Sequence, residues 1–142
     1  MSENYESMAS ELLQVNERML QVPNRQQLAK LTKGECFVLN YLLTHNVQAH
    51  PGDLSKGLAV STARIAALLN RMEEKRLISR LPDPCNNRQV IVSLSPHGLE
   101  LIQEIRREVL AAAAQMLERL GPEDAREYIR IQKKIISNVT SK

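Results

Sequence analysis

A change of hydrophobic period between residues 51 and 95 constrains the fold of this chain more than any other feature of its sequence. Over 61–75 the apolar residues recur every three or four positions, as on one face of a helix. Two short runs rich in β-branched residues follow at 78–81 and 90–94, and these favour strands. Residues 82–88 between them include two prolines and two asparagines, which favour turns. The pattern predicts a helix followed by a β-hairpin with a long polar tip.

Two further helical segments precede this unit. Thr32 and Glu35 have the spacing of a capping box, in which each side chain accepts a hydrogen bond from the other residue's backbone N–H. We therefore expect a helix from Thr32 to about residue 46. Pro51 suits the first turn of a short helix over 51–58.

The short helix and the helix of 61–75 are joined by a tight turn, after which Ser61 is a good N-cap. The order is therefore helix, short helix, turn, helix, strand, wing, strand. This order defines a winged helix-turn-helix, which we place over residues 32–95. The expected fold class is mainly α, of the α+β type, with a two-stranded β wing.

Helices are also predicted at both ends of the chain. In the first 22 residues and again beyond residue 96, apolar residues recur at three- and four-residue spacings, which gives helices with narrow apolar seams. Such seams need a partner surface, and a symmetric dimer is the commonest way to supply one. We expect residues 1–142 to fold as a single domain whose helices at 1–22 and 96–142 form a dimerisation layer.

The winged helix-turn-helix places particular side chains where they can contact DNA. In this arrangement the second helix of the turn presents its first residues to base edges in the major groove. Here those residues are Ser61, Thr62 and Arg64. Arginine can donate two hydrogen bonds to one guanine, and serine and threonine contact bases or phosphates. The hairpin tip can reach neighbouring phosphates or the minor groove; its candidate residues are Asn86, Asn87 and Arg88.

Arg71 has two interpretations that the sequence leaves open. It lies further along the same helix, where it can contact a DNA phosphate. It can also pair with Asp83 of the hairpin and so brace the wing against the helix.

At this point the residues resemble a known family, the MarR family of bacterial transcriptional regulators. The resemblance covers nearly the whole chain and is most specific from the wing to the following helix. It rests on Leu31-Thr32-x-x-Glu35-x-x-Val38-Leu39-x-x-Leu42, Ser61-Thr62, Leu68-Leu69-Asn70-Arg71-Met72-Glu73-Glu74-Lys75, Asp83-Pro84 to Arg88, Val90-x-Val92-x-Leu94-Ser95-Pro96-x-Gly98 and Leu120-Gly121-Pro122-Glu123-Asp124.

The resemblance implies a cytoplasmic homodimer that binds a pseudo-palindromic double-stranded DNA operator, one winged region to each half. It also implies a repressor that a small apolar or aromatic effector releases, bound in apolar space between the dimerisation helices and the winged region. Cys36, on the helix that begins near Thr32, is the candidate residue for this effector pocket or for a redox response; the favoured interpretation is a small residue of the core.

The chain departs from the family pattern at several positions. The middle of the expected recognition helix carries Ala66 and Ala67 where the family has polar or basic residues. Asn86 and Asn87 replace charged residues of the wing, which leaves Arg88 as the cation at the tip. Weaker or differently specified DNA binding is therefore expected.

A further departure lies at the turn after the recognition helix. Arg76 stands there in place of a usual glycine, so we expect either a less comfortable backbone conformation at that residue or a shift of the turn.

Other functions receive less support. His45, His50 and Cys36 do not have the spacing of a zinc site, so no metal or other cofactor is expected. The sequence shows no catalytic triad, paired carboxylates or phosphate-binding loop, so no enzyme activity is expected. A winged helix that binds another protein instead of DNA remains open as the alternative.

The charge and the composition agree with a cytoplasmic DNA-binding protein. No apolar run has the length of a membrane helix, and the first residues lack the features of a secretory signal. The formal net charge is +3. Residues 61–88 hold six basic and three acidic residues, and the rest of the chain holds 13 of each. The excess of positive charge therefore lies in the expected DNA-reading region.

Overall fold

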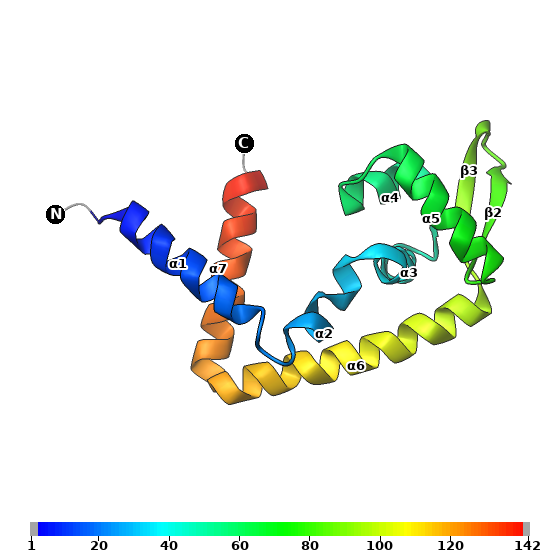
Figure 1. The fold of residues 1–142 in the computed structure, drawn as a ribbon. Helices are drawn as coiled ribbons and strands as arrows, with labels where there is room; N and C mark the ends of the chain where they lie inside the picture. Colours follow the sequence, from blue (N-terminus) through cyan, green and yellow to red (C-terminus); the bar gives the residue numbers. More distant parts are fainter. Residues whose placement is uncertain (1–2, 141–142) are drawn as a thin grey trace. The chain divides into compact units, whose positions relative to one another are not determined.

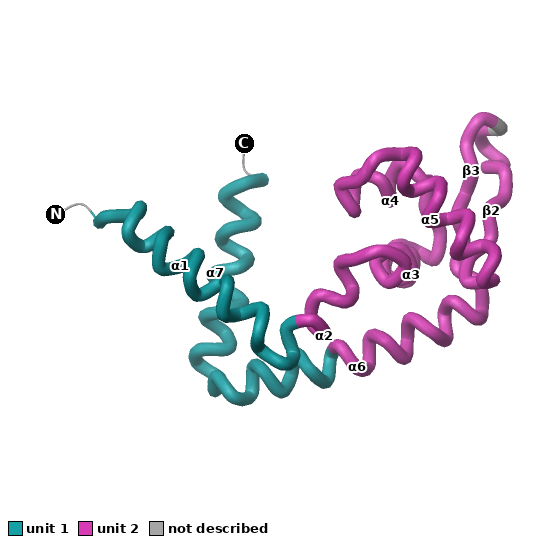
Figure 2. Tube along the Cα trace, in the orientation of Figure 1, with its two compact units in different colours: residues 1–25, 110–142 teal, residues 26–109 magenta. Residues whose placement is uncertain are grey.

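A computed structural model describes residues 3–140 of the 142, apart from the side chain of Asn87. The chain forms two compact units, one of residues 1–25 and 110–142 and the other of residues 26–109 (Figure 2). The elements, of which Figure 1 labels the seven α-helices, β2 and β3, are α1 Tyr5–Met19, α2 Arg25–Ala29, a 3₁₀ turn Lys30–Thr32, α3 Gly34–Thr44, β1 Gln48–Ala49, α4 Pro51–Leu58, α5 Thr62–Glu74, β2 Ile78–Asp83, β3 Asn86–Leu94, α6 Pro96–Leu120 and α7 Pro122–Thr140.

The predicted winged helix-turn-helix lies within the second unit, which also contains the first half of α6. The single domain and the dimerisation layer expected from the sequence stay predictions. Among the described residues, no helix combines the length and apolar character needed to cross a membrane.

The β-hairpin is longer and its tip shorter than the sequence predicted. β2 and β3 pair antiparallel from Ile78 opposite Leu94 to Asp83 opposite Asn86, with an irregularity after Pro82. The prediction of a long polar tip was therefore wrong. Asn86 and Asn87 belong to β3, so only Pro84 and Cys85 separate the two strands. The sequence also missed β1, which pairs antiparallel with β3 and makes the sheet three-stranded, in the order β1-β3-β2.

The core of the second unit is built from the apolar stripes of its helices and one face of its sheet. α3, α4, α5, β3 and α6 all contribute side chains to it. Those with the least exposure are Val38, Leu39, Leu42, Leu54, Ile65, Leu69, Met72, Val92 and Ile102. The apolar stripes predicted from the sequence are thus buried within this unit. The opposite face of each helix therefore points outward.

The capping box predicted at the start of α3 does not form. The N-cap is Lys33, and the Thr32 hydroxyl instead donates to the Ala29 carbonyl at 2.6 Å. The Glu35 carboxylate accepts hydrogen bonds from Lys75 Nζ at 2.9 and 3.0 Å. Because Thr32 ends a 3₁₀ turn that the sequence did not reveal, its hydroxyl serves that turn and not the next helix.

A cluster of hydrogen bonds joins the turn after α5 to the start of α6. Arg76 has a φ of 62°, the left-handed conformation that its place in a glycine position led us to expect. Ser95 Oγ donates to the Arg76 carbonyl at 2.7 Å and accepts from the Gly98 N–H at 3.0 Å. The Ser95 N–H donates to the Leu77 carbonyl at 3.1 Å. These contacts fix the base of the hairpin to α6.

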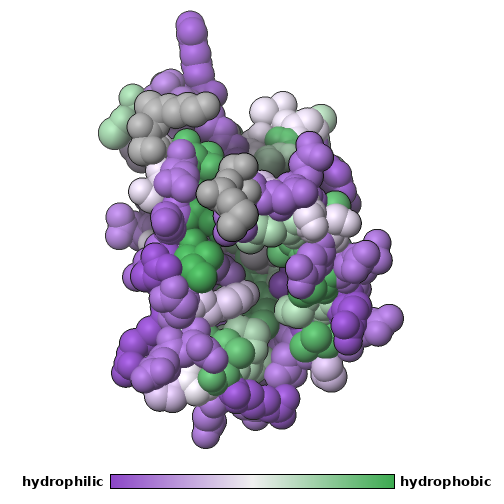
Figure 3. Space-filling model, turned by 90° about the vertical axis from the view of Figure 1, so that its left-hand side faces the viewer, coloured by the Kyte–Doolittle hydropathy of each residue, from purple (hydrophilic) through white to green (hydrophobic). Residues whose placement is uncertain are grey.

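The first unit contains α1, α7 and the second half of α6, and its apolar seams are exposed. Of the described residues in α1 and α7, none is buried. Tyr5 and Met8 of α1 are 72% and 53% exposed, and Ile135 and Ile136 of α7 are 59% and 62% exposed. Figure 3 faces the side on which α1 and α7 lie and shows hydrophobic side chains, in green, at the surface.

Candidate nucleic-acid interface

The turn between α4 and α5 sets the direction of the expected recognition helix. Ala59 ends α4 in the left-handed conformation, with a φ of 57°. The Ser55 hydroxyl then donates to the Val60 carbonyl at 2.7 Å, while the Val60 N–H donates to the Ser55 carbonyl at 3.1 Å. These reciprocal bonds satisfy the end of α4 and let α5 begin two residues later.

The start of α5 is capped as the sequence predicted. Ser61 Oγ accepts a hydrogen bond from the Arg64 N–H at 3.2 Å. Ile65, Leu68, Leu69 and Met72 of α5 are buried, so the opposite face of α5 points to solvent. That exposed face carries the three residues predicted to read bases, the two alanines and the residue with two interpretations: Ser61, Thr62, Arg64, Ala66, Ala67 and Arg71.

A basic cleft of about 360 Å³ lies along one side of α5. Arg64 and Arg71, two helical turns apart, line it together with Lys33 from the start of α3. Its other lining residues are Thr32, Gly34, Leu58, Val60 and Leu68. Lys33 was not among the predicted site residues, because the capping-box pattern places the start of this helix at the preceding threonine.

Two of the six basic residues in 61–88 pair with carboxylates within the second unit. Lys75 pairs with Glu35 at 2.9 Å, and Arg80 Nη2 pairs with Glu73 Oε1 at 3.1 Å. The hydrogen bond from the Arg80 side chain is the main reason that the pKa of Glu73 is lowered. Within the part of the chain that the structure describes, Arg64, Arg71 and Arg88 form no ion pair. Their charge therefore remains available to an anionic partner.

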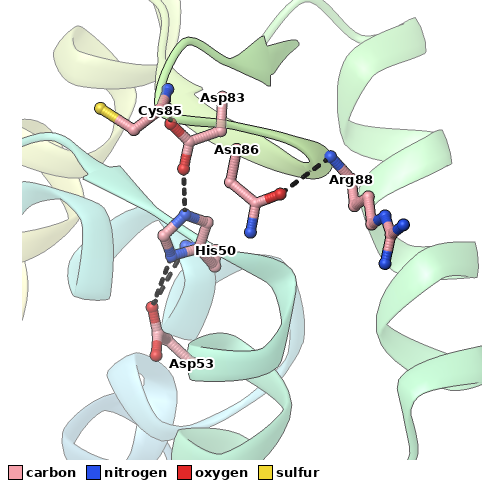
Figure 4. Close-up of polar contacts among 6 residues, drawn as sticks. All are labelled: His50, Asp53, Asp83, Cys85, Asn86 and Arg88. Carbon is pink, nitrogen blue, oxygen red and sulfur yellow. Dashed lines mark hydrogen bonds and ion pairs between the residues drawn. The ribbon is translucent and has the colours of Figure 1, made fainter.

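The wing brace differs from the one considered from the sequence. Asp83 does not pair with Arg71; its Oδ2 lies 2.9 Å from His50 Nε2, and its Oδ1 accepts from the Cys85 N–H at 2.8 Å. Both contacts are drawn in Figure 4. These interactions, with that to His50 the largest, lower the pKa of Asp83. The pairing with Arg71 was wrong because His50, at the start of α4, occupies the position beside Asp83.

At the wing tip, Asn86 Oδ1 accepts a hydrogen bond from the Arg88 N–H at 3.1 Å (Figure 4). Asn86 and Arg88 are exposed. The side chain of Asn87 lies outside the part of the structure that is described. Asn86 thus orders the backbone that carries Arg88, a local role that asparagine favours in turns.

The remaining candidate residues are not brought together. Cys36 is a half-buried free thiol on α3, and Cys85 is an exposed free thiol at the wing tip. The His45 ring stacks on Tyr41, with the ring centroids 3.8 Å apart. Among residues 3–140, no group of three or more histidine, cysteine, aspartate or glutamate side chains is placed to hold a metal ion. The roles considered for Cys36 stay predictions.

Comparisons with known proteins support the architecture. No family model matches the chain. The HTH-type transcriptional regulator YdgJ of Bacillus subtilis is 27% identical over 100 residues, which are 70% of this chain and 61% of that protein. This chain therefore spans less than two thirds of the relative it matches.

Solved structures match over almost the whole chain. AbsC, a MarR family transcriptional regulator from Streptomyces coelicolor, has a TM-score of 0.70 and 22% identity, with 100% of this chain and 99% of AbsC covered. NadR in complex with 4-hydroxyphenylacetate has a TM-score of 0.65 and 23% identity, with 98% and 96% covered. The resemblance found in the sequence is thus confirmed: the chain has the winged helix-turn-helix fold of the MarR family transcriptional regulators.

Proposed function

We propose that this protein is a sequence-specific double-stranded DNA-binding regulator of transcription. The observation that carries the proposal is the placement of Arg64 and Arg71 on the exposed face of α5, without an ion pair in the described structure. Two other cations of the same region, Lys75 and Arg80, are instead paired with nearby carboxylates. A helix that leaves its arginines unpaired on the face opposite its core, next to a β wing, suits binding in the major groove.

The residues divide into two roles. Ser61, Thr62 and Arg64 lie at the exposed start of α5, where contacts to base edges are made in such motifs. Arg71 and Lys33 line the cleft beside this helix and suit contacts to the phosphate backbone. We assign the wing tip, Asn86, Asn87 and Arg88, to the adjacent phosphates or minor groove.

We further propose that the protein acts as a homodimer on a pseudo-palindromic operator. The exposed apolar side chains of α1 and α7 support this, because single-chain proteins seldom leave large apolar patches uncovered. A shallow groove of about 540 Å³ runs along α1 and is lined by Tyr5, Met8, Ala9, Glu11, Leu12 and Val15. A second copy would cover these seams, and its own α5 would read the other half of the operator.

Repression and release by a small apolar or aromatic effector complete the proposal. NadR, which has the same fold, binds 4-hydroxyphenylacetate. The effector arm is tested by adding aromatic acids to the protein–DNA complex and measuring the dissociation constant. If no acid of the panel changed the affinity for DNA, the proposed release by an effector would be contradicted, and the proposal of DNA binding would be unaffected.

The main test is fluorescence anisotropy with the DNA upstream of the protein's own gene and with random DNA of the same length, each at two salt concentrations. We expect the affinity for both to fall steeply as salt rises, because several phosphate contacts release counterions. Arg64→Ala should reduce the preference for the specific site by about 1–3 kcal/mol. Arg88→Ala should weaken binding to both DNAs, and Arg25→Ala, at the exposed start of α2 and outside the proposed dimerisation helices, is the matched control.

Two results would contradict the proposal. Binding of neither DNA at low salt would favour the alternative, a winged helix that binds another protein. If Arg64→Ala, like Arg88→Ala, lost affinity equally for specific and random DNA, the base-reading role assigned to Arg64 would be wrong.

The dimer is tested separately by sedimentation velocity. Leu12→Glu on α1, where the side chain is 58% exposed, should shift the protein to a monomer without unfolding the winged unit. A monomeric wild type, or a variant that remains dimeric, would contradict the dimerisation layer.

A further inference from the structure

The hairpin is held to the helices by two carboxylate contacts that differ in their chemistry. Nearer its base, Arg80 of β2 pairs with Glu73 of α5 at 3.1 Å, and the Arg80 N–H also donates to Glu73 at 3.1 Å. At its outer end, Asp83 pairs with His50 at 2.9 Å. Arginine keeps its charge at every physiological pH, whereas histidine changes charge between pH 5 and 8. The inner contact therefore involves a permanently charged guanidinium, and the outer one involves an imidazole.

Asp83 depends on His50 for a positive partner. The residue is 8% exposed, and the described structure places no lysine or arginine within ion-pair distance of it. A carboxylate with so little exposure is stable when it is paired and hydrogen-bonded, and costly when its partner is removed. A protonated His50 provides a charged donor, while a neutral His50 provides at most a neutral N–H.

The groups that face His50 come from three elements. α4 contributes Asp53, whose Oδ2 lies 3.7 Å from His50 Nδ1 and accepts the His50 N–H at 3.2 Å. β2 contributes Asp83, and the turn that follows contributes Cys85, whose N–H is bound to Asp83. Among the described residues, β1, β3 and α3 place no charged group in contact with the imidazole. Among the described residues, two carboxylates and no recorded cation thus face this ring.

The contact extends through the wing tip to Arg88. Asp83 accepts the Cys85 N–H and lies opposite Asn86 in the strand register. Asn86 in turn accepts the Arg88 N–H at 3.1 Å. Figure 4 shows the contacts of His50 with Asp53 and Asp83 and, separately, the contact between Asn86 and Arg88. The position of Asp83 relative to α4 therefore determines the path of the backbone that presents Arg88.

We propose that His50 is a positioning residue for the wing, whose protonation tightens its contact with Asp83 and so strengthens the DNA contact made by Arg88. This inference rests on the proposed function. Charge-assisted hydrogen bonds are roughly twice as strong as neutral ones. We therefore expect the affinity for specific DNA to fall about fivefold from pH 5.5 to pH 8.5 at constant ionic strength.

Four variants, measured by anisotropy over this pH range, separate positioning from general charge. His50→Gln should bind DNA, at every pH, with the lower affinity that the wild type shows at pH 8.5. Its affinity should no longer show the pH dependence that His50 contributes. Glu73→Gln weakens the non-titrating contact and should lower affinity while keeping the wild-type slope. His45→Gln is the matched control, because His45 is the C-cap residue of α3 and pairs with neither carboxylate. Arg88→Ala should abolish the His50-dependent slope, since His50 acts through Arg88.

A second measurement does not depend on DNA. In the free protein, the amide resonances of Cys85 and Arg88 should shift with pH between 5 and 8, and His50→Gln should remove these shifts. If the wild type binds no DNA but the amides titrate with His50, the proposed function fails and the wing coupling stands. Amide shifts that are the same in wild type and His50→Gln, or an affinity slope that survives in His50→Gln, would overturn the inference.

Discussion

Gly98→Ala should destabilise the protein at the junction between the hairpin and α6. A Cβ atom at Gly98 would lie 2.1 Å from the Leu77 carbonyl oxygen and 3.0 Å from Leu94 Cδ1. The oxygen cannot move aside freely, because it accepts the Ser95 N–H at 3.1 Å. The methyl group therefore requires a shift of backbone and not merely of a flexible side chain.

The magnitude follows from three contributions. Forcing an extra carbon into a packed position costs about 1–3 kcal/mol. Loss of the Ser95 hydrogen bond adds about 1 kcal/mol. Alanine is a better helix former than glycine and returns about 1 kcal/mol. We expect the free energy of unfolding to fall by about 1–3 kcal/mol.

The assay is urea denaturation followed by circular dichroism, at one fixed protein concentration because dimerisation would make stability depend on concentration. Gly52→Ala is the matched control: Gly52 lies in the first turn of α4, and no heavy atom lies within 4 Å of its added Cβ. That variant should be neutral or more stable by up to about 1 kcal/mol. If Gly98→Ala proves as stable as Gly52→Ala, the assigned clash with Leu77 is refuted.

Three other predictions concern single residues. Ser61→Ala removes the N-cap of α5 and should lower the free energy of unfolding by about 1 kcal/mol in the same assay; an unchanged midpoint would contradict the cap. Val47 has a φ of 70° and is 43% exposed, so Val47→Gly should relieve strain and stabilise the protein by up to about 1 kcal/mol. A lower denaturation midpoint for Val47→Gly would show that the packing of the valine side chain outweighs the backbone strain. The pKa of Asp83 is lowered in the folded protein, so its contribution is present above the ordinary aspartate pKa of about 3.9 and is lost as pH falls through the lower folded pKa. Asp83→Asn should therefore reduce the dependence of the unfolding free energy on pH under acidic conditions. An acid dependence identical to that of the wild type would argue against the contact.

The sequence predicted the helices of the second unit well, because their periodicity and caps are local signals. The helix over 51–58 and the Ser61 cap are confirmed, as is the strained turn at Arg76. The capping box at Thr32 failed because a hydroxyl group has several carbonyls within reach, and the preceding turn supplied one of them. β1 was missed because two residues are too few to show a period.

For the candidate site, the sequence alone determined which side chains are presented: Arg64 and Arg71 share the face of α5 opposite its buried stripe. The helical period fixes this, whatever else packs nearby. The ion-pair partners of the charged residues could not be determined in this way. Arg80 pairs with Glu73, and Asp83 pairs with His50, 33 residues away. Only the tertiary structure decided these pairs, because the distance between two charges depends on how the elements pack and not on their separation along the chain.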